Sequence, residues 1–518
     1  MKINKREILF LIVLALFCVA RFTFRCFPDN DLWTRLLVGE SIIDGFSIIK
    51  QDIFSYLPTH IWYDHEWGAS IFIYGFFKLF HEWGLLLLKC LLTFGIAFFM
   101  FLTVKLREPK HTTPYNILFY AISLMAASYV LNGTVRCHLF TFFFFTVFLY
   151  ILERVRLKGF KHWWIMPVIM LFWANIHGGC VSGIGLLVMY LIGEALNKKP
   201  VAFYVKALIS SCLVTFINPW GIGYVVFLLK ATTMSRELIL EWRGTFETSL
   251  LKPYLFFKLY FYFMCLTGII TFIKKLYKKE TLDWTKIIVL LSTLYLAAAH
   301  VKHQPFFVIA WAIFLYDDVY SVFGNIFGKL SDTIKNKLII TKDVLSYLTV
   351  VLLSLFFISC FKTPITITQS AYPYYAIEFI KINDLKGKLF INFDWGSYAE
   401  YKLFPFNKIV MDGRYEEVFA PELIYEMSNF HMLKNNRWYA IIEMYPPDIM
   451  VIEKKYPVYK KILEKTNWLL VFENNMTGVF ISEQLKKDKY LYPPTDINYY
   501  EQTKFDKNFS FVKRIKKE

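Results

Sequence analysis

The sequence predicts a polytopic α-helical membrane protein that ends in a small soluble α/β domain, and three observations carry this prediction. The 518 residues are 56% hydrophobic with a mean hydropathy of +0.41, whereas soluble domains contain roughly 45–50% apolar residues. Long apolar segments recur over the first 361 residues. From Thr363 the composition becomes that of a soluble domain, with alternating polar and apolar runs.

About eleven apolar segments are candidates for membrane-spanning helices, because one crossing needs about 17 to 25 predominantly apolar residues. They lie near residues 8–26, 84–104, 114–131, 138–152, 163–177, 179–194, 201–217, 254–273, 285–300, 304–320 and 344–361. The first resembles a signal peptide, but it is followed by Arg21 and Arg25 and not by a cleavage site of small residues. We interpret it as a retained helix.

The formal charge of +17 indicates membrane topology and no nucleic-acid partner, because Lys and Arg gather at the ends of apolar segments. Basic clusters occur in every second loop, which places these loops in the cytoplasm by the positive-inside rule. They lie at residues 2–6, 105–110, 154–161, 198–199, 274–279 and 329–342. The N-terminus is therefore predicted to be cytoplasmic, and the chain from residue 362 onward to lie outside the cell membrane.

The predicted domains are a transmembrane domain (1–361), an extracytoplasmic α/β domain (362–485) and a peripheral tail (486–518). The transmembrane domain includes a first outer loop (27–67). Two amphipathic segments, Leu32–Phe46 and Trp67–Phe80, are short for a crossing and are predicted to lie on the membrane surface. In the α/β domain we predict strands at Lys388–Phe393, Lys408–Met411 and Asp448–Ile452 and a helix at Pro421–Leu433.

The first outer loop is the strongest candidate for chemistry because it is rich in acids. It contains Asp29, Asp31, Glu40, Asp44, Asp52, Asp64 and Glu66, with Trp33, Trp62 and Trp67 among them. Carboxylates beside a bilayer are costly and usually functional. The alternative is that they are solvated loop charges. The eight cysteines lie in or beside apolar segments and give neither a disulfide framework nor a CxxC metal site.

The segment Asp29-Asn-Asp31-Leu-Trp33, the flanking surface helices, the many spans and the outer α/β domain together resemble the GT-C superfamily of membrane glycosyltransferases. These enzymes take sugars from polyprenyl-phosphate carriers. The resemblance implies a lipid-linked sugar donor and a glycan, lipid or protein acceptor. It also implies that Asp31 is the first-loop acid, which acts as a base on the acceptor hydroxyl or positions the acceptor.

Within this superfamily the chain is similar to the oligosaccharyltransferase catalytic subunit, whose soluble domain begins with a Trp-Trp-Asp-x-Gly motif. Here Asn392-Phe393-Asp394-Trp395-Gly396 keeps the Asp-x-Gly spacing but replaces both tryptophans. Acceptor-sequon recognition is therefore not implied. Asp394 and Trp395 are candidates for substrate binding, and the alternative for Asp394 is a turn cap. Met411-Asp-Gly-Arg414 is a predicted turn whose Arg414 lines the floor of the site.

The oligosaccharyltransferase subunit also carries a second acidic pair that is used with a divalent metal. The matching loop here, Asn132–His138, contains no carboxylate, so the sequence predicts no metal site. Arg136 is predicted to neutralise the leaving phosphate in its place. The alternative is an arginine that snorkels to the membrane interface.

The remaining substrate-binding candidates are polar residues at predicted outer edges of the spans or in the outer loops. They are His138, His177, Glu241, His300, Lys302 and His303, together with Asp52 and Glu66 of the first outer loop. Polar residues at a helix break line cavities more often than they face lipid. Lys302 between two histidines is a candidate phosphate ligand, and the alternative is interface anchoring.

Two other functions are compatible with this pattern. The missing second acidic motif favours a non-catalytic scaffold for envelope assembly. A lipid or glycan transporter would have ionisable residues in the middle of its spans and repeated halves, and neither is found. We therefore predict a membrane glycosyltransferase first, a scaffold second and a transporter third.

Overall fold

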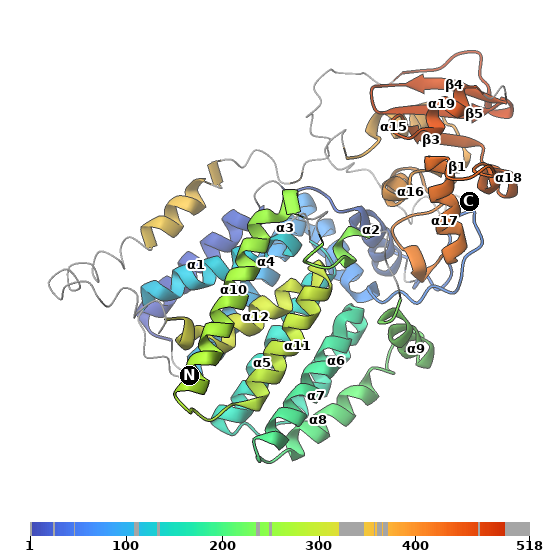
Figure 1. The fold of residues 1–518 in the computed structure, drawn as a ribbon. Coiled ribbons are helices and arrows are strands. Elements are labelled where there is room, and N and C mark those ends of the chain that lie inside the picture. Colours follow the sequence, from blue (N-terminus) through green and yellow to red (C-terminus); the bar gives the residue numbers. More distant parts are fainter. Residues whose placement is uncertain are drawn as a thin grey trace. The chain divides into compact units, whose positions relative to one another are not determined.

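The computed structural model describes residues 3–23, 26–45, 47–107, 113–131, 135–234, 239–247, 251–320, 347–356, 358–359, 365, 371–464 and 467–492 (Figure 1). The chain forms two compact units. The helical unit comprises residues 1–26, 86–133 and 137–362, and the mixed unit comprises residues 27–85, 134–136 and 363–518. Each unit is described separately below.

The helical unit consists mainly of apolar helices (Figure 1). Its helices are α1 (Lys5–Thr23), the second part of α3 (Trp67–Lys105), α4 (Thr113–Leu131), α5 (His138–Lys158), α6 (Ile165–Ile176), α7 (Val181–Leu196), α8 (Ala202–Val214), α9 (Ile222–Ala231), α10 (Leu251–Tyr277), α11 (Trp284–Ala299) and α12 (Gln304–Phe314). Short 3₁₀ turns among the described residues of this unit are η1 (Gly178–Cys180), η2 (Leu240–Trp242) and η4 (Val301–His303).

Four helices within the described residues are long and apolar enough to cross a membrane: Trp67–Lys105, His138–Lys158, Gly178–Leu196 and Lys258–Tyr277. Six further apolar helices, including Ile165–Ile176 and Tyr347–Phe356, have 10 to 17 residues. Such helices support a membrane protein, and each predicted span coincides at least in part with a helix. The number of crossings stays a prediction.

Two local features of the helical pattern follow from particular residues. His81 has left-handed backbone angles (φ 52°, ψ −140°) inside α3, so this element is two helices that meet at a kink. The kink separates the predicted segments Trp67–Phe80 and 84–104. The segment between the predicted spans 201–217 and 254–273 contains the short helix α9, whose run Ile222–Leu229 is largely apolar.

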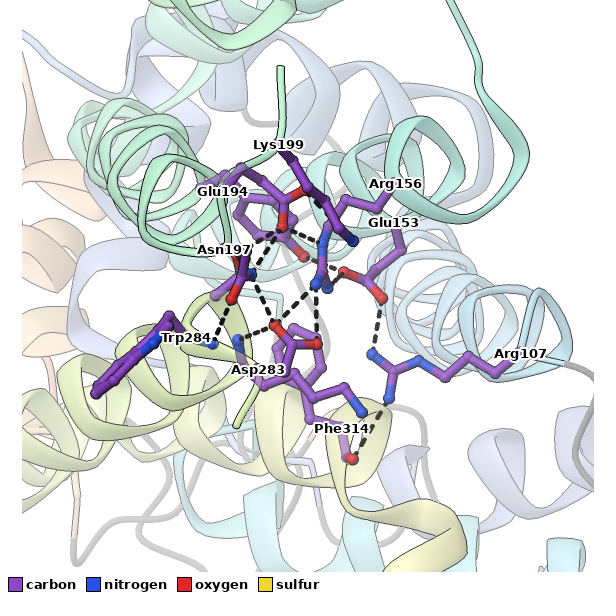
Figure 2. A network of polar contacts seen from close by, with 12 residues as sticks. Arg107, Glu153, Arg156, Glu194, Asn197, Lys199, Asp283, Trp284 and Phe314 are labelled. Carbon is purple, nitrogen blue, oxygen red and sulfur yellow. Dashed lines mark hydrogen bonds and ion pairs between the residues drawn. The ribbon is translucent and has the colours of Figure 1, made fainter. Parts of the chain in front are cut away.

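A buried ionic network connects several helices of this unit at one end (Figure 2). The Arg156 guanidinium of α5 lies 2.7 Å from carboxylate oxygens of both Glu153 and Glu194, and 2.8 Å from Asp283. Arg107 pairs with the other oxygen of Glu153 at 2.7 Å. Because Glu194 belongs to α7 and Asp283 caps α11, these ion pairs tie α5, α7 and α11 together.

The mixed unit is built on a five-stranded sheet with the order β2-β1-β3-β5-β4. Strands β1 (Gly387–Ile391), β2 (Asn407–Ile409) and β3 (Ile449–Glu453) are parallel, and β4 (Trp468–Glu473) and β5 (Thr477–Ser482) add an antiparallel hairpin. The helices are α2 (Asn30–Ile43), the first part of α3, α15 (Tyr374–Ile382), α16 (Gly396–Leu403), α17 (Pro421–Met432), α18 (Ala440–Met444) and α19 (Val458–Leu463). Short 3₁₀ turns are η5 (Phe393–Trp395), η6 (Tyr415–Glu417) and η7 (Glu483–Leu485).

The predicted α/β class of this unit agrees with the sheet, and the predicted strands and helix overlap β1, β2, β3 and α17. The sequence analysis missed the hairpin. Its turn is fixed by Asn474, whose side-chain oxygen accepts hydrogen bonds from the backbone N–H groups of Met476 and Thr477 at 2.9 and 2.7 Å. Most of the predicted tail (486–518) lies outside the described residues.

The first outer loop is part of the core of the mixed unit. In α2, ten consecutive residues from Leu32 to Ser41 are buried against other parts of the protein, and the position of this helix at the membrane surface stays a prediction. Trp33 packs its ring against Tyr372, Tyr398 and Tyr401 at centroid distances of 5.1 to 5.7 Å. This shared aromatic core explains why the structure groups the loop with the α/β domain, whereas the predicted boundaries joined it to the transmembrane domain.

The loop also extends the sheet. Tyr56 donates its backbone N–H to the Ile409 carbonyl at 3.0 Å, and Ile409 donates to the Phe54 carbonyl at 2.9 Å. Ser55 therefore lies beside β2 in a parallel bridge, and it covers an edge that would otherwise present unpaired backbone groups.

Candidate functional site

Asp31 lies at the start of α2 beside a second acid and an arginine. Asp29 is the N-cap residue, and its carboxylate accepts the backbone N–H of Asp31 at 3.0 Å. This cap fixes the first helical turn, which carries Asp31. Arg136 places Nε 3.1 Å from Asp29 and Nη2 3.4 Å from Asp31. The sequence-predicted acid and the predicted cation are thus neighbours within one unit.

The surroundings of Asp31 raise the proton affinity of its carboxylate. Desolvation raises the pKa of Asp31 well above its ordinary value, and the charge of Asp29 raises it further. Arg136 opposes this shift. The side chain nevertheless remains 45% exposed, so the carboxylate is accessible to a reactant. An accessible carboxylate with a raised pKa is a suitable general base, because a higher pKa makes the carboxylate a stronger base.

The motif Asp64-His65-Glu66 forms a second ionic cluster in the same unit. Arg35 pairs with Asp64 at 2.6 Å and lies 3.7 Å from Glu66. His65 lies 3.2 Å from Glu417, which also accepts the Trp62 indole N–H at 3.1 Å. Glu66 and Arg35 lie near enough to act on the pKa of Asp31, which Glu66 raises and Arg35 lowers. Glu66 is 20% exposed and remains a candidate ligand of a substrate.

Arg414 is buried and fully engaged by carboxylates. Its guanidinium pairs with Asp52 of the first outer loop, with Glu400 of α16 at 3.1 Å and with Asp412 at 2.8 Å. The arginine side chain is 3% exposed, and that of Asp52 is fully buried. These contacts join the loop to the α/β domain. Direct roles of Asp52 and Arg414 toward a substrate stay predictions.

The Asp-x-Gly motif follows β1 and begins α16. Trp395 is 3% exposed and donates its indole N–H to the Ala371 carbonyl at 2.9 Å, so the ring is a packing anchor. Gly396 faces the Met411 carbonyl so closely that a Cβ at this position would collide with it. Asp394 lies in η5, and its carboxylate is the exposed group of the motif. Substrate binding by Asp394 and Trp395 stays a prediction.

Two of the predicted histidines hold helix ends in the helical unit. His138, at the start of α5, has Nε2 3.1 Å from the Val130 carbonyl. His177 ends α6, and its Nδ1 accepts the Gly179 backbone N–H at 2.8 Å. The proton of the His177 ring is therefore on Nε2. The predicted helix break at this position is present.

The remaining predicted residues of this unit gather around Trp242. His300 Nδ1 lies 2.6 Å from the Trp242 carbonyl, and Lys302 Nζ lies 4.4 Å from the centre of the indole ring. The His303 ring is 5.5 Å from the same indole. Glu241 precedes Trp242 in η2. Arg136 belongs to the mixed unit, whereas His177, Lys302 and His303 belong to the helical unit, and their roles in substrate binding stay predictions.

The carboxylates around Asp31 do not fit a divalent cation. A hard cation takes six or more oxygen ligands, whereas a guanidinium lies against both Asp29 and Asp31. The Arg136 guanidinium thus occupies the position beside these two acids that a positively charged metal ion would need. No step proposed below uses a metal.

Comparison with solved structures confirms the predicted resemblance to the oligosaccharyltransferase at the level of fold. The chain is similar to the oligosaccharyltransferase of Archaeoglobus fulgidus tethered with an acceptor peptide, with 11% identity, a TM-score of 0.55, and coverage of 86% of this chain and 69% of that chain. The same enzyme in complex with Zn and sulfate gives 12% identity, a TM-score of 0.52, and coverage of 86% and 68%.

ArnT from Cupriavidus metallidurans bound to undecaprenyl phosphate also matches, with 11% identity, a TM-score of 0.45, and coverage of 93% of this chain and 99% of that chain; this score is too low to carry an argument. Neither a protein-family model nor a curated protein sequence matches the chain.

Proposed function

We propose that this protein is a membrane glycosyltransferase that moves a sugar from a polyprenyl-phosphate carrier to an acceptor hydroxyl or amide at the outer face of the cell membrane. The observation that carries the proposal is the pair formed by Asp31 and Arg136 in a chain with the fold of an oligosaccharyltransferase. An envelope glycan, a lipid and a protein are the acceptor classes.

The chemistry assigns one task to each residue of the pair. The acceptor oxygen or nitrogen forms a bond to the anomeric carbon, the bond from that carbon to the phosphate oxygen breaks, and Asp31 takes the acceptor proton. The polyprenyl phosphate leaves with the electron pair. Arg136 stabilises the negative charge that develops on the phosphate, because a guanidinium binds phosphate through paired hydrogen bonds. Phosphate binding by Lys302 and its neighbouring histidines in the helical unit stays a separate prediction.

Asp31→Asn tests the assignment of the base. The full chain in lipid nanodiscs is supplied with a panel of undecaprenyl-phosphate-linked hexoses and pentoses and with candidate acceptors, and released undecaprenyl phosphate is measured. We expect Asp31→Asn to lower release by about 10²-fold or more and to leave binding of undecaprenyl phosphate, measured by native mass spectrometry, nearly unchanged.

Two control variants show whether position 31 is special. Asp384→Asn changes a carboxylate that is 72% exposed and is expected to have wild-type activity. Asp29→Asn keeps a good N-cap residue but removes a charge from Arg136, so we expect a smaller loss than at Asp31. Equal release by Asp31→Asn and wild type would reject the catalytic role and favour the envelope scaffold.

A further inference from the structure

The turn Asp412-Gly413-Arg414 is held from three sides. Arg414 donates through Nε to Asp412, through Nη1 to Asp52 and through Nη2 to Glu400. All three carboxylates are fully or almost fully buried. A buried guanidinium with every nitrogen engaged in ion pairs has little freedom to move, so the turn that carries it is rigid.

The same network reaches the helix that carries Asp31. The second carboxylate oxygen of Glu400 accepts the hydroxyl of Thr34 at 3.2 Å. Thr34 lies in α2 three residues after Asp31, on the next turn of the same helix. Arg414 is therefore connected through one carboxylate to the element that presents Asp31.

Gly413 brings the backbone of the turn directly against Asp31. A Cβ placed on Gly413 would lie 2.9 Å from Asp31 Oδ1, which is closer than real Cβ contacts. Because Arg414 holds the next residue in place, an added methyl group would displace the carboxylate and not the turn.

We propose that the turn Asp412–Arg414 is a positioning element for Asp31: Gly413 leaves the space that the carboxylate occupies, and Arg414 holds the turn at that distance. Asp31 is the catalytic residue in this assignment, and Gly413 and Arg414 act through it. The inference rests on the proposed function for its effect on sugar transfer, whereas the contact itself is testable without a sugar donor.

The first experiment is Gly413→Ala in the release assay. We expect kcat to fall by about 10²-fold, the scale of a misplacement of about 1 Å, with KM for the lipid-linked sugar changed little, because the methyl group touches the base and not the proposed phosphate ligands. The matched control is Gly75→Ala in the same unit, where the new Cβ would make an ordinary contact 3.7 Å from Ile43. Unchanged kcat in Gly413→Ala would overturn the proposal.

The second experiment reads the carboxylate directly. A carbodiimide labels protonated carboxyl groups, and labelling of Asp31 is followed against pH by peptide mass spectrometry in full-length protein in nanodiscs. We expect Gly413→Ala to shift the midpoint of Asp31 labelling by about 0.5 pH unit or more, because the carboxylate moves relative to Asp29 and Arg136. Gly75→Ala is expected to keep the wild-type midpoint.

Arg414→Lys tests whether Arg414 holds the turn in place. It also replaces the first variant if Gly413→Ala does not fold. Lysine keeps the charge but cannot hold three carboxylates with a planar fork, so we expect the same shift in Asp31 labelling; Arg437→Lys, at an exposed position, is its control. Wild-type labelling in the folded variant overturns the proposal. A labelling shift in a protein that transfers no sugar from any donor supports the positioning element and counts against the proposed function.

Discussion

At the scale of single residues, two aspartates of the same helix start have different tasks. Asp29 is the cap, and its carboxylate binds both the Asp31 backbone N–H and Arg136. Asp31 donates its backbone N–H to that hydrogen bond, and its own carboxylate does not cap the helix. The side chain of Asp31 is 45% exposed against 21% for Asp29, which supports the proposal that Asp31 and not Asp29 is the base.

His65 is expected to make stability depend on pH. Burial lowers the pKa of His65, but Glu417, Glu66 and Asp64 outweigh it and raise the pKa to about 9. The folded state therefore binds the proton more tightly than the unfolded state, whose histidine pKa is about 6.5. The stabilisation is fully present below about pH 6.5 and is lost as the pH rises through about 9.

His65→Gln should therefore cost on the order of 1 to 3 kcal/mol at pH 6 and much less at pH 10. Thermal unfolding of the wild type and of His65→Gln from pH 6 to 10 measures this difference in stability. His60→Gln, at an exposed position, provides the control. A stability difference that stays constant over this pH range would contradict the charged His65–Glu417 pair.

Only part of the candidate site could be predicted from the sequence, because several residues that contact one another are far apart along the chain. Asp31 and Arg136 were identified because each lies in a recognisable local context. Glu417 was missed as a partner of Trp62 because the two are 355 positions apart, and Glu400 was missed because its partner Thr34 is 366 positions away. Arg35 carried a local signal that was overlooked, since it follows Asp31 by four positions on one helix.

At the scale of elements, the ionic network of Figure 2 is expected to hold the ends of α5, α7 and α11. Arg156 is 4% exposed, and Glu153 and Glu194 are 0% and 3% exposed. Removal of one partner from a buried ion pair costs about 3–5 kcal/mol, because the other charge is left uncompensated. Arg156→Met should therefore lower the unfolding temperature strongly, and Arg156→Lys less.

Thermal unfolding in nanodiscs measures this effect, with Lys158→Met, at an exposed position two residues later, as the control. An unfolding temperature equal to that of wild type for Arg156→Met would show that the network contributes no net stability. Some members of the basic clusters used to predict topology, among them Arg107 and Arg156, thus also form ion pairs inside the unit.

Element prediction succeeded where hydrophobic pattern alone decides the structure. The apolar segments and the buried parallel strands β1 and β3 are of this kind, because continuous apolar runs are typical of both. The position of α2 could not be predicted in this way. Its polar residues Thr34, Arg35 and Glu40 indicate an exposed face, yet all three are buried, and the partners of Thr34 and Arg35 come from distant segments.

At the scale of the whole molecule, composition predicted an apolar helical part followed by a soluble α/β part. It did not predict that the first outer loop belongs to the same compact unit as the α/β part. The loop packs Trp33 into the aromatic core of the mixed unit and adds Ser55 beside β2. Both contacts join segments more than 300 positions apart, and no local pattern records them. A loop that completes a distant domain is expected to lie on the same side of the membrane as that domain.

This expectation can be tested by cysteine labelling. Because the first outer loop and the α/β domain form one compact unit, and the basic clusters alternate along the chain, we expect Asn436→Cys to react with a membrane-impermeant maleimide in intact cells. Lys161→Cys, in a predicted cytoplasmic cluster, should react only after the membrane is permeabilised. Both positions are exposed. A buried position of the α/β domain such as Ser397, which is 2% exposed, would not react and is unsuitable as a probe. The wild-type protein with its native cysteines gives the background. Labelling of Asn436→Cys only after permeabilisation would place the unit, and with it Asp31, in the cytoplasm, where the proposed transfer at the outer face is impossible.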